Sequence, residues 1–268
     1  MPEPDTLSSA ISSLLGAASE VDAVLLEARG LTRRFGGLAA VDDVSIALRR
    51  GEVHAVIGTN GAGKSTLVNL LSGELAPTAG SIHLGEDDVT RWSQPRRARA
   101  GIGRSYQRTN IFGPFSVLEN ARLAAQAAHP RPWALWESAR RCALSLRSAD
   151  EALASAGLSP AAAPVAETLS HGGKRQLEIA MCLATRPRVL LLDEPLAGMG
   201  AEETERMLGL LAELKKGHAV LLVEHDMDAV FRVADRITVM VNGAVIASDV
   251  PERIRHDPQV RVAYLGED

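Results

Sequence analysis

The stretch Gly58-Thr-Asn-Gly-Ala-Gly-Lys-Ser65 matches the pattern G-x-x-x-x-G-K-[ST] and decides the fold class of this chain. It follows the apolar run Val53–Ile57, which has the length of a buried strand. It precedes Ser65–Ser72, where leucines recur at helical spacing and Gly73 supplies a C-cap. A strand, a glycine-rich loop and a helix in this order surround a phosphate with backbone N–H groups and the positive end of a helix. The stretch therefore predicts a phosphate-binding loop in an α/β fold.

The side chains at the end of this loop have separate expected tasks. Lys64 is expected to reach the β- and γ-phosphates of ATP, and the Ser65 hydroxyl is expected to bind Mg²⁺. The loop residues expected to bind the nucleotide are Gly58, Thr59, Asn60, Gly61, Ala62, Gly63, Lys64, Ser65 and Thr66.

An acidic pair ends a second apolar run, Val189-Leu-Leu-Leu-Asp-Glu-Pro195. A strand buried on both faces would bring Asp193 out at its carboxyl end, beside the phosphate loop, where it can hold Mg²⁺. Glu194 would then face the γ-phosphate and could act as general base toward the attacking water. Two acids after a core strand are common in proteins. The pair indicates a catalytic site here because a phosphate loop lies upstream in the same chain.

The order of the remaining elements predicts a mostly parallel sheet with helices on both faces. The expected strands and helices outside the loop are Ala23–Arg29, Val44–Leu48, a hairpin over Gly80–Val89, Gln176–Ala184, Val189–Leu192, Glu202–Lys216, Ala219–Val223, a helix capped by Asp226, and a hairpin of Arg236–Val241 with Ala244–Ser248 through Asn242-Gly243.

Between these elements, residues from about Glu119 to Gly157 are rich in alanine and predict helices, with a break at His129-Pro-Arg-Pro132. We interpret residues 112–182 as an inserted helical subdomain of one domain over 23–268. Residues 1–22 are expected to form a flexible tail.

Composition excludes several other classes. The 268 residues carry a formal net charge of −4, with 46% hydrophobic and 23% charged residues, which is typical of a globular chain and gives no footprint for nucleic acid. Cys142 and Cys182 lack the spacing of a zinc site, and a reducing cytoplasm fits them best. No apolar run approaches the ~18 residues of a membrane span. The first 20 residues lack Lys and Arg, which argues against a signal peptide.

Four further motifs occur in order along the chain: Phe35, Tyr106-Gln107, Leu169-Ser-His-Gly-Gly173 and Val223-Glu-His-Asp226. With the phosphate loop and the acidic pair, they resemble ATP-binding cassette (ABC) proteins. Leu169–Gly173 looks like the signature motif, normally Leu-Ser-Gly-Gly-Gln. Tyr106-Gln107 looks like the Q-loop, and His225 like the switch histidine. The resemblance covers residues 23–268.

This resemblance implies a role for each motif. Phe35 would stack on adenine, Gln107 would join Ser65 and Asp193 on Mg²⁺, and His225 would bond the γ-phosphate and the attacking water. Glu194, His225 and Gln107 are the expected catalytic residues. The signature residues would contact ATP held by a second subunit, which implies a dimer with two ATP molecules sandwiched head to tail; they are Ser170, His171, Gly172 and Gly173. The implied fold adds an N-terminal antiparallel β subdomain to the parallel sheet.

The chain departs from the family pattern at four positions. His171 replaces the first signature glycine and Gly173 the glutamine, which puts the contact across the dimer in question. Gly200 stands where an aspartate is usual, and Thr59 replaces a common proline. None of these changes removes a residue needed to bind Mg-ATP.

A finer resemblance is to the ATPase subunits of importers for branched-chain amino acids and amides, including urea. It rests on Arg33–Gly37, Asp193–Met199, Val223–Met227 and Val262–Glu267. It implies an ATP-hydrolysing subunit on the cytoplasmic face of the membrane. Its partners would be permease subunits, a second ATPase subunit and, indirectly, a substrate-binding protein.

Three other functions compete. A non-transport ABC ATPase would usually carry two cassettes or coiled-coil insertions. A P-loop kinase or GTPase would not need the signature motif or His225. A nucleotide-sensing module without turnover is separated by an ATPase assay.

Three further groups of side chains were interpreted from the pattern alone. Phe112, Phe115 and Val117 are expected to form an apolar patch for a membrane partner's helix. Trp133 and Trp136 are expected to pack within the helical subdomain. The basic residues Arg96, Arg97, Arg99, Arg104 and Arg108 are expected to form a solvated face.

Overall fold

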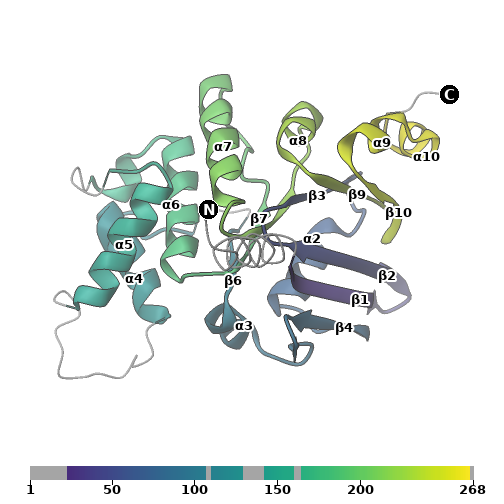
Figure 1. The fold of residues 1–268 in the computed structure, drawn as a ribbon, viewed down its shortest axis with the longest axis horizontal. Helices are drawn as coiled ribbons and strands as arrows, with labels where there is room; N and C mark the ends of the chain where they lie inside the picture. The colour runs from purple at the N-terminus through teal and green to yellow at the C-terminus, as the bar shows by residue number, and fades with distance from the viewer. Residues whose placement is uncertain (1–22, 107–109, 129–141, 160–163, 266–268) are drawn as a thin grey trace, which may run out of the picture.

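A six-stranded sheet forms the centre of the molecule (Figure 1). The computed structural model describes residues 23–106, 110–128, 142–159 and 164–265. The strand order is β10-β9-β3-β8-β7-β6, and all neighbours are parallel except the edge pair β10–β9. The strands are β3 (Val53–Gly58), β6 (Ile102–Arg104), β7 (Val189–Asp193), β8 (Ala219–Val223), β9 (Arg236–Val241) and β10 (Ala244–Asp249). The expected parallel α/β fold is confirmed.

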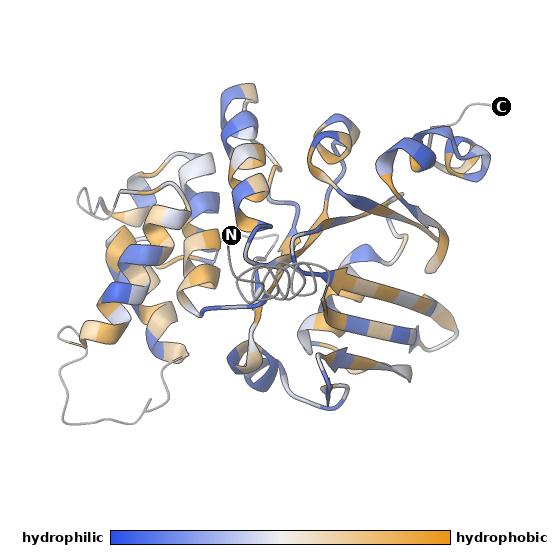
Figure 2. Cartoon of the chain, viewed as in Figure 1, coloured by the Kyte–Doolittle hydropathy of each residue, from blue (hydrophilic) through white to orange (hydrophobic). Residues whose placement is uncertain are grey.

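Strand β7 shows why its sequence is a continuous apolar run. Leu190 and Leu192 face a core shared with helices α6 (His171–Ala184) and α7 (Ala201–Leu214). Val189 and Leu191 point to the opposite face, toward helix α2 (Lys64–Ser72). Because successive side chains of a strand alternate between faces, burial on both sides requires apolar residues throughout. Figure 2 shows hydrophobic colours along these central strands, while the helices carry both kinds of residue.

A second, antiparallel sheet of order β2-β1-β4-β5 covers the other side of α2. Its strands are β1 (Val24–Phe35), β2 (Leu38–Arg49), β4 (Ala79–Leu84) and β5 (Asp87–Asp88). The sequence Arg33-Arg-Phe-Gly-Gly37 predicts a turn, and this is wrong for its first three residues, because the ladder between β1 and β2 continues to the pair Phe35–Leu38. Only Gly36 and Gly37 form the turn.

Helices α4 (Val117–Ala127), α5 (Ala143–Ser155) and α6 pack against one another beside the central sheet (Figure 1). The predicted start of α6 at Gln176 was wrong by five residues, because the Ser170 hydroxyl accepts a hydrogen bond from Gly173 N and caps the helix there. The proposed break at His129–Pro132, Trp133 and Trp136 lie outside the described residues.

The remaining helices and turns complete the described chain. They are α3 (Gln94–Ala100), η3 (Ala166–Thr168), α8 (Met227–Val233), α9 (Pro251–His256), α10 (Pro258–Val260) and η4 (Arg261–Leu265). Within the described ranges, no helix combines the length and the hydrophobicity needed to cross a bilayer.

Candidate active site

The phosphate loop runs from the end of β3 to the start of α2, as its sequence predicts. Gly63 is the N-cap of α2 and has φ 99°, in the left-handed region. A Cβ on Gly63 would lie 2.2 Å from the carbonyl oxygen of Ala40, so a larger residue is excluded twice, by its φ angle and by space. The loop therefore packs tightly against the second sheet while its amides stay at the helix N-terminus.

Lys64 is buried, and its ammonium group contacts the backbone at the start of the phosphate loop. Its Nζ donates hydrogen bonds to the carbonyl oxygens of Gly58, at 2.7 Å, and Thr59, at 3.0 Å. Burial lowers the pKa of Lys64, and the nearby carboxylates of Glu194 and Asp193 oppose that shift. The cation is thus held in the loop by weak carbonyl acceptors that a phosphate can replace.

A cleft of about 510 Å³ opens over this loop. It is lined by Leu38, Ala39, Ala40, Asn60, Gly61, Ala62, Gly63, Lys64, Ser65, Thr66, Glu194, His225 and Asn242. Gly58 and Thr59 lie at the start of the loop and are not among the lining residues.

Four lining residues were missed by the sequence reading: Leu38, Ala39 and Ala40 of β2, and Asn242 of the β9–β10 turn. The turn is tied to the loop because Gly243 N donates to Ala62 O at 3.0 Å. No nucleotide-binding motif marks these positions, since they reach the cleft only through contacts between distant segments; Asn242 was expected only as part of a hairpin turn.

Phe35, the expected adenine-stacking residue, does not line this cleft. It is 46% exposed, and the Arg33 guanidinium lies 4.7 Å from its ring centroid. Its neighbour across the hairpin is Leu38, which does line the cleft. Stacking on adenine therefore stays a prediction for Phe35.

Asp193 lies at the carboxyl end of β7 and is 3% exposed. Its Oδ1 has no hydrogen-bond partner among the described residues. Burial raises the pKa of Asp193, and the positive charge of Arg104 opposes the shift most strongly. An orphaned, buried carboxylate oxygen fits a hard divalent cation such as Mg²⁺. Ser65, at the start of α2, would be the second ligand, and Gln107 lies outside the described residues.

Glu194 and His225 meet because they follow neighbouring parallel strands. Asp193 pairs with Val223 in the sheet, so the segments that follow the two strands leave at the same edge, with Glu194 one residue past its strand and His225 two residues past its strand. His225 Nε2 lies 2.8 Å from Glu194 Oε1. Glu194 has φ 51°, which is strained for a residue other than glycine and is held by a 2.9 Å hydrogen bond from its amide to Val223 O. The structure thus brings these two predicted catalytic residues together over the phosphate loop.

Glu224, beside His225, is a buried acid that the sequence reading did not single out. Its Oε1 accepts from Leu196 N at 2.7 Å and its Oε2 from His225 N at 3.2 Å. Burial raises the pKa of Glu224 to about 7. Glu224 therefore links the segment after β7 to the histidine after β8. The sequence signal that could have identified Glu224 was its position inside the motif Val223-Glu-His-Asp226.

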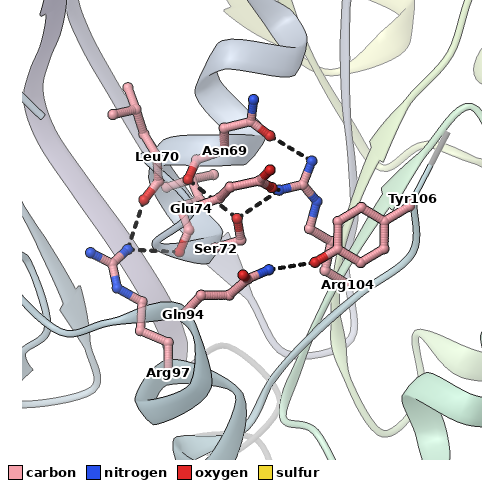
Figure 3. A network of polar contacts seen from close by, with 9 residues as sticks. Asn69, Leu70, Ser72, Glu74, Gln94, Arg97, Arg104 and Tyr106 are labelled. Atoms are coloured by element: carbon pink, nitrogen blue, oxygen red, sulfur yellow. Dashed lines mark hydrogen bonds and ion pairs between the residues drawn. The ribbon is translucent and has the colours of Figure 1, made fainter. Parts of the chain in front are cut away.

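Two arginines before the Q-loop bind the carboxyl end of α2 (Figure 3). Arg97 donates to the carbonyl oxygens of Leu70, at 2.7 Å, and Leu71, at 2.9 Å. Arg104 donates to Asn69 Oδ1 at 2.6 Å and to Ser72 Oγ at 2.8 Å.

Arg97 is 1% exposed. The expectation of a solvated basic face was therefore wrong for Arg97, because unpaired carbonyls at a helix end attract cations. It was also wrong for Arg104, because the side chains of Asn69, Ser72 and Glu74 accept its hydrogen bonds. Arg108 lies outside the described residues. Gln94 of α3 donates to the Tyr106 hydroxyl, so the start of the Q-loop is bonded to α3, and Arg97 of α3 is in turn bonded to the end of α2 (Figure 3).

The signature residues Ser170, His171, Gly172 and Gly173 do not line the phosphate-loop cleft. They form the first turn of α6, beside the segment that precedes α7. A Cβ on Gly198 would lie 3.4 Å from His171 Cε1, so the imidazole occupies the space beside that glycine. His171, a departure from the signature pattern, therefore lies beside Gly198 of the Asp193–Met199 stretch.

The comparisons with known proteins agree with this geometry. A family model described as "ABC transporter" matches residues 41–197. A second, described as "Branched-chain amino acid ATP-binding cassette transporter", matches residues 244–268. The chain belongs to the ABC transporter family, whose ATP-binding subunits hydrolyse ATP.

Its relatives include two transport ATP-binding proteins. The chain is 41% identical to the high-affinity branched-chain amino acid transport ATP-binding protein LivG of Salmonella typhimurium, over 91% of this chain and 98% of LivG. The same figures hold for BraF of Pseudomonas aeruginosa, which has the same description. The crystal structures of a nucleotide-free ATP-binding cassette and of the ADP conformation of MJ1267 each match with a TM-score of 0.80 and 29% identity, over 91% of this chain and 100% of theirs. The expected ABC ATPase fold is confirmed.

Proposed function

We propose that this chain is the ATP-hydrolysing subunit of an importer for branched-chain amino acids. The hydrolytic part rests on one observation: Glu194 and His225 form a hydrogen-bonded pair over the phosphate loop. The cargo rests on the descriptions of LivG and BraF, since no residue of an ATPase subunit touches cargo. Urea and short amides are the alternative cargo.

In this proposal the chain's own groups divide the work of hydrolysis. Lys64 leaves the carbonyls of Gly58 and Thr59 and binds the β- and γ-phosphates. Glu194 accepts the proton of the attacking water on its carboxylate, and His225 holds Glu194 Oε1 so that the carboxylate faces the water.

Mg²⁺ fits at Ser65 and Asp193, with Gln107 as the expected third ligand. When bound, it would neutralise charge on the phosphates. Asp193 has a buried oxygen ready for a cation, and this is the support within the described residues.

We also propose a peripheral place on the cytoplasmic face, with a second ATPase subunit and permease subunits as partners and a substrate-binding protein contacted indirectly. Phe112 and Phe115 support a docking surface, whereas including Val117 in this patch was wrong, because Val117 is buried at the start of α4. They stack with ring centroids 5.6 Å apart and are 54% and 44% exposed. Asn120 fixes this loop by bonding both the N–H and the C=O of Phe112, at 2.8 and 3.0 Å. A rigid, exposed aromatic pair suits a partner helix.

Reconstitution tests the function. The chain would be assembled in vesicles with its permease subunits, and uptake of labelled leucine and labelled urea would be measured with and without Glu194→Gln. Leucine uptake that depends on Glu194 would support the proposal. Urea uptake alone would favour the alternative cargo, and ATP turnover with no permease association would indicate a non-transport ATPase.

The docking surface has its own test. Replacing Phe112 and Phe115 by Asp should leave ATP hydrolysis by the isolated chain unchanged and should remove co-purification with the permease. Leu144→Asp is the control, because Leu144 is 56% exposed on a different helix, α5. Co-purification of the double variant at the yield of the control would contradict docking at this patch.

A further inference from the structure

An acid from α7 lies against the N-terminus of the signature helix α6. Glu203 Oε1 accepts hydrogen bonds from Ser170 Oγ at 2.8 Å and from Gly172 N at 3.3 Å. The two donors lie 33 and 31 residues before Glu203 in the chain. The contact is therefore a product of the tertiary fold.

These two donors belong to the signature residues, which the family resemblance assigns to ATP held by a second subunit. A carboxylate and a phosphate are both anions that accept hydrogen bonds from a hydroxyl and from N–H groups at a helix N-terminus. In the single chain the carboxylate of Glu203 takes this place.

The residues around the Glu203 carboxylate leave space for it and stabilise its charge. A Cβ on Gly172 would lie 2.7 Å from Glu203 Oε1, so any larger residue there would push the acid away. The hydrogen bond from Ser170 lowers the pKa of Glu203, which keeps it ionised at neutral pH. The recess around these groups has a volume of about 30 Å³, and Arg206 also lines it. This is room for about two water molecules and not for a phosphate beside the carboxylate.

We propose that Glu203 is an internal occupant of the signature site, a positioning residue that satisfies Ser170 and Gly172 in the separate subunit and withdraws when the partner's γ-phosphate arrives. The inference rests on the proposed ATP sandwich. The side chain lies at the surface of α7, where rotamer changes are fast, so withdrawal needs no movement of the helix. Because the phosphate must displace a bound anion, Glu203 raises the ATP concentration at which two subunits close.

The test compares two neighbouring acids of α7. In the full chain carrying Glu194→Gln, which slows hydrolysis, Mg-ATP is titrated and dimer formation is followed by sedimentation. Glu203→Gln should lower the ATP concentration for half-maximal dimer by about tenfold, the scale of one charge-assisted hydrogen bond. Glu202→Gln is the matched control. It removes the same charge one residue away, from an exposed pair with Arg206, and touches neither Ser170 nor Gly172.

Equal ATP requirements for Glu203→Gln and Glu202→Gln would overturn the inference, as would a higher requirement for Glu203→Gln. The side-chain amide of the Glu203→Gln variant can still accept hydrogen bonds from Ser170 and Gly172. Glu203→Ala removes that contact and should also dimerise at a lower ATP concentration. Binding of ATP by single chains, measured in parallel, separates the two proposals. A chain that binds no Mg-ATP contradicts the proposed function. A chain that binds Mg-ATP but stays monomeric even with Glu203→Gln contradicts this inference.

Discussion

The N-termini of α2 and α6 both present phosphate-binding groups, and each is satisfied differently within the single chain. At α2 the binding group is a cation, and Lys64 rests on two backbone carbonyls of its own loop. At α6 the binding groups are donors, and Ser170 and Gly172 rest on the carboxylate of Glu203. Lys64 and Gly172 are buried, and buried polar groups need partners, so in both places the same chain supplies the acceptor.

The two sites also differ in completeness. The cleft over α2 gathers residues from β2, the phosphate loop and the ends of β7 and β8, so one chain supplies both binding groups and the Glu194–His225 pair. The recess at α6 lacks such a pair among its lining residues. The comparison suggests that one site is built for chemistry and the other for reporting a partner's nucleotide. Substitutions at each site can test this difference.

The largest effect is expected from Glu194→Gln at the first site. Loss of the general base should lower ATP turnover by about 10²–10⁴-fold while ATP still binds, because Lys64 is unchanged. Single-turnover hydrolysis and nucleotide binding measure the two parts. Glu205→Gln, at an exposed ion pair with Arg232, is the control. Near-normal turnover would mean that another group activates the water, and His225 would be the first candidate to test.

Lys64→Ala should weaken Mg-ATP binding by about 10³-fold, since two charge-assisted contacts to phosphate are lost. A fluorescent nucleotide titration measures it, with Lys216→Ala as a control at an exposed lysine. Circular dichroism should show an unchanged fold. Unchanged affinity would refute the assignment of Lys64 to the phosphates.

Glu224 connects the two regions, because it binds both His225 and the segment that leads toward His171. Its pKa is raised from 4.5 to about 7, so between these pH values the folded chain holds a proton that the unfolded chain releases. The free energy of unfolding contributed by this group therefore falls as pH rises through that window.

Glu224→Gln removes this titration. The unfolding free energy of the variant minus that of the unmodified chain should rise by about 3 kcal/mol between pH 4 and pH 8. Urea unfolding at several pH values measures the difference. A difference that does not change with pH would show that Glu224 is ionised throughout.

The smallest effect is expected from Ser170→Ala, which removes the N-cap of α6 and should cost about 1 kcal/mol of stability. Ser116→Ala is a matched control, because Ser116 caps α4 by the same contact, to Glu119 N at 3.1 Å. Both should unfold at similarly lower urea concentrations. Only Ser170→Ala should impair ATP-driven dimer formation. Equal impairment by both variants would show that Ser170 acts only as a helix cap.

Local sequence predicted much of the central architecture. The apolar run before Gly58 became β3, the Asn242-Gly243 turn joined β9 to β10, and Asp226 capped α8 by accepting from Ala229 N at 3.1 Å. Errors occurred where a contact outside the local pattern prevailed. Arg97 is buried because it binds the end of α2, to a residue 27 positions away in the chain. The early start of α6 has a different cause, because Ser170 caps it through a local contact to Gly173 N.

The sequence by itself determined the class of this protein, because a phosphate loop and an acid-ended strand are local patterns whose chemistry follows from residue type and order. The tertiary structure alone decided which side chains meet. It placed Glu203 on Ser170, Glu224 on Leu196, and Arg104 on Asn69. These contacts join residues about 30 positions apart in the chain, and no local periodicity or spacing predicts them, because they depend on how the elements of the fold pack together.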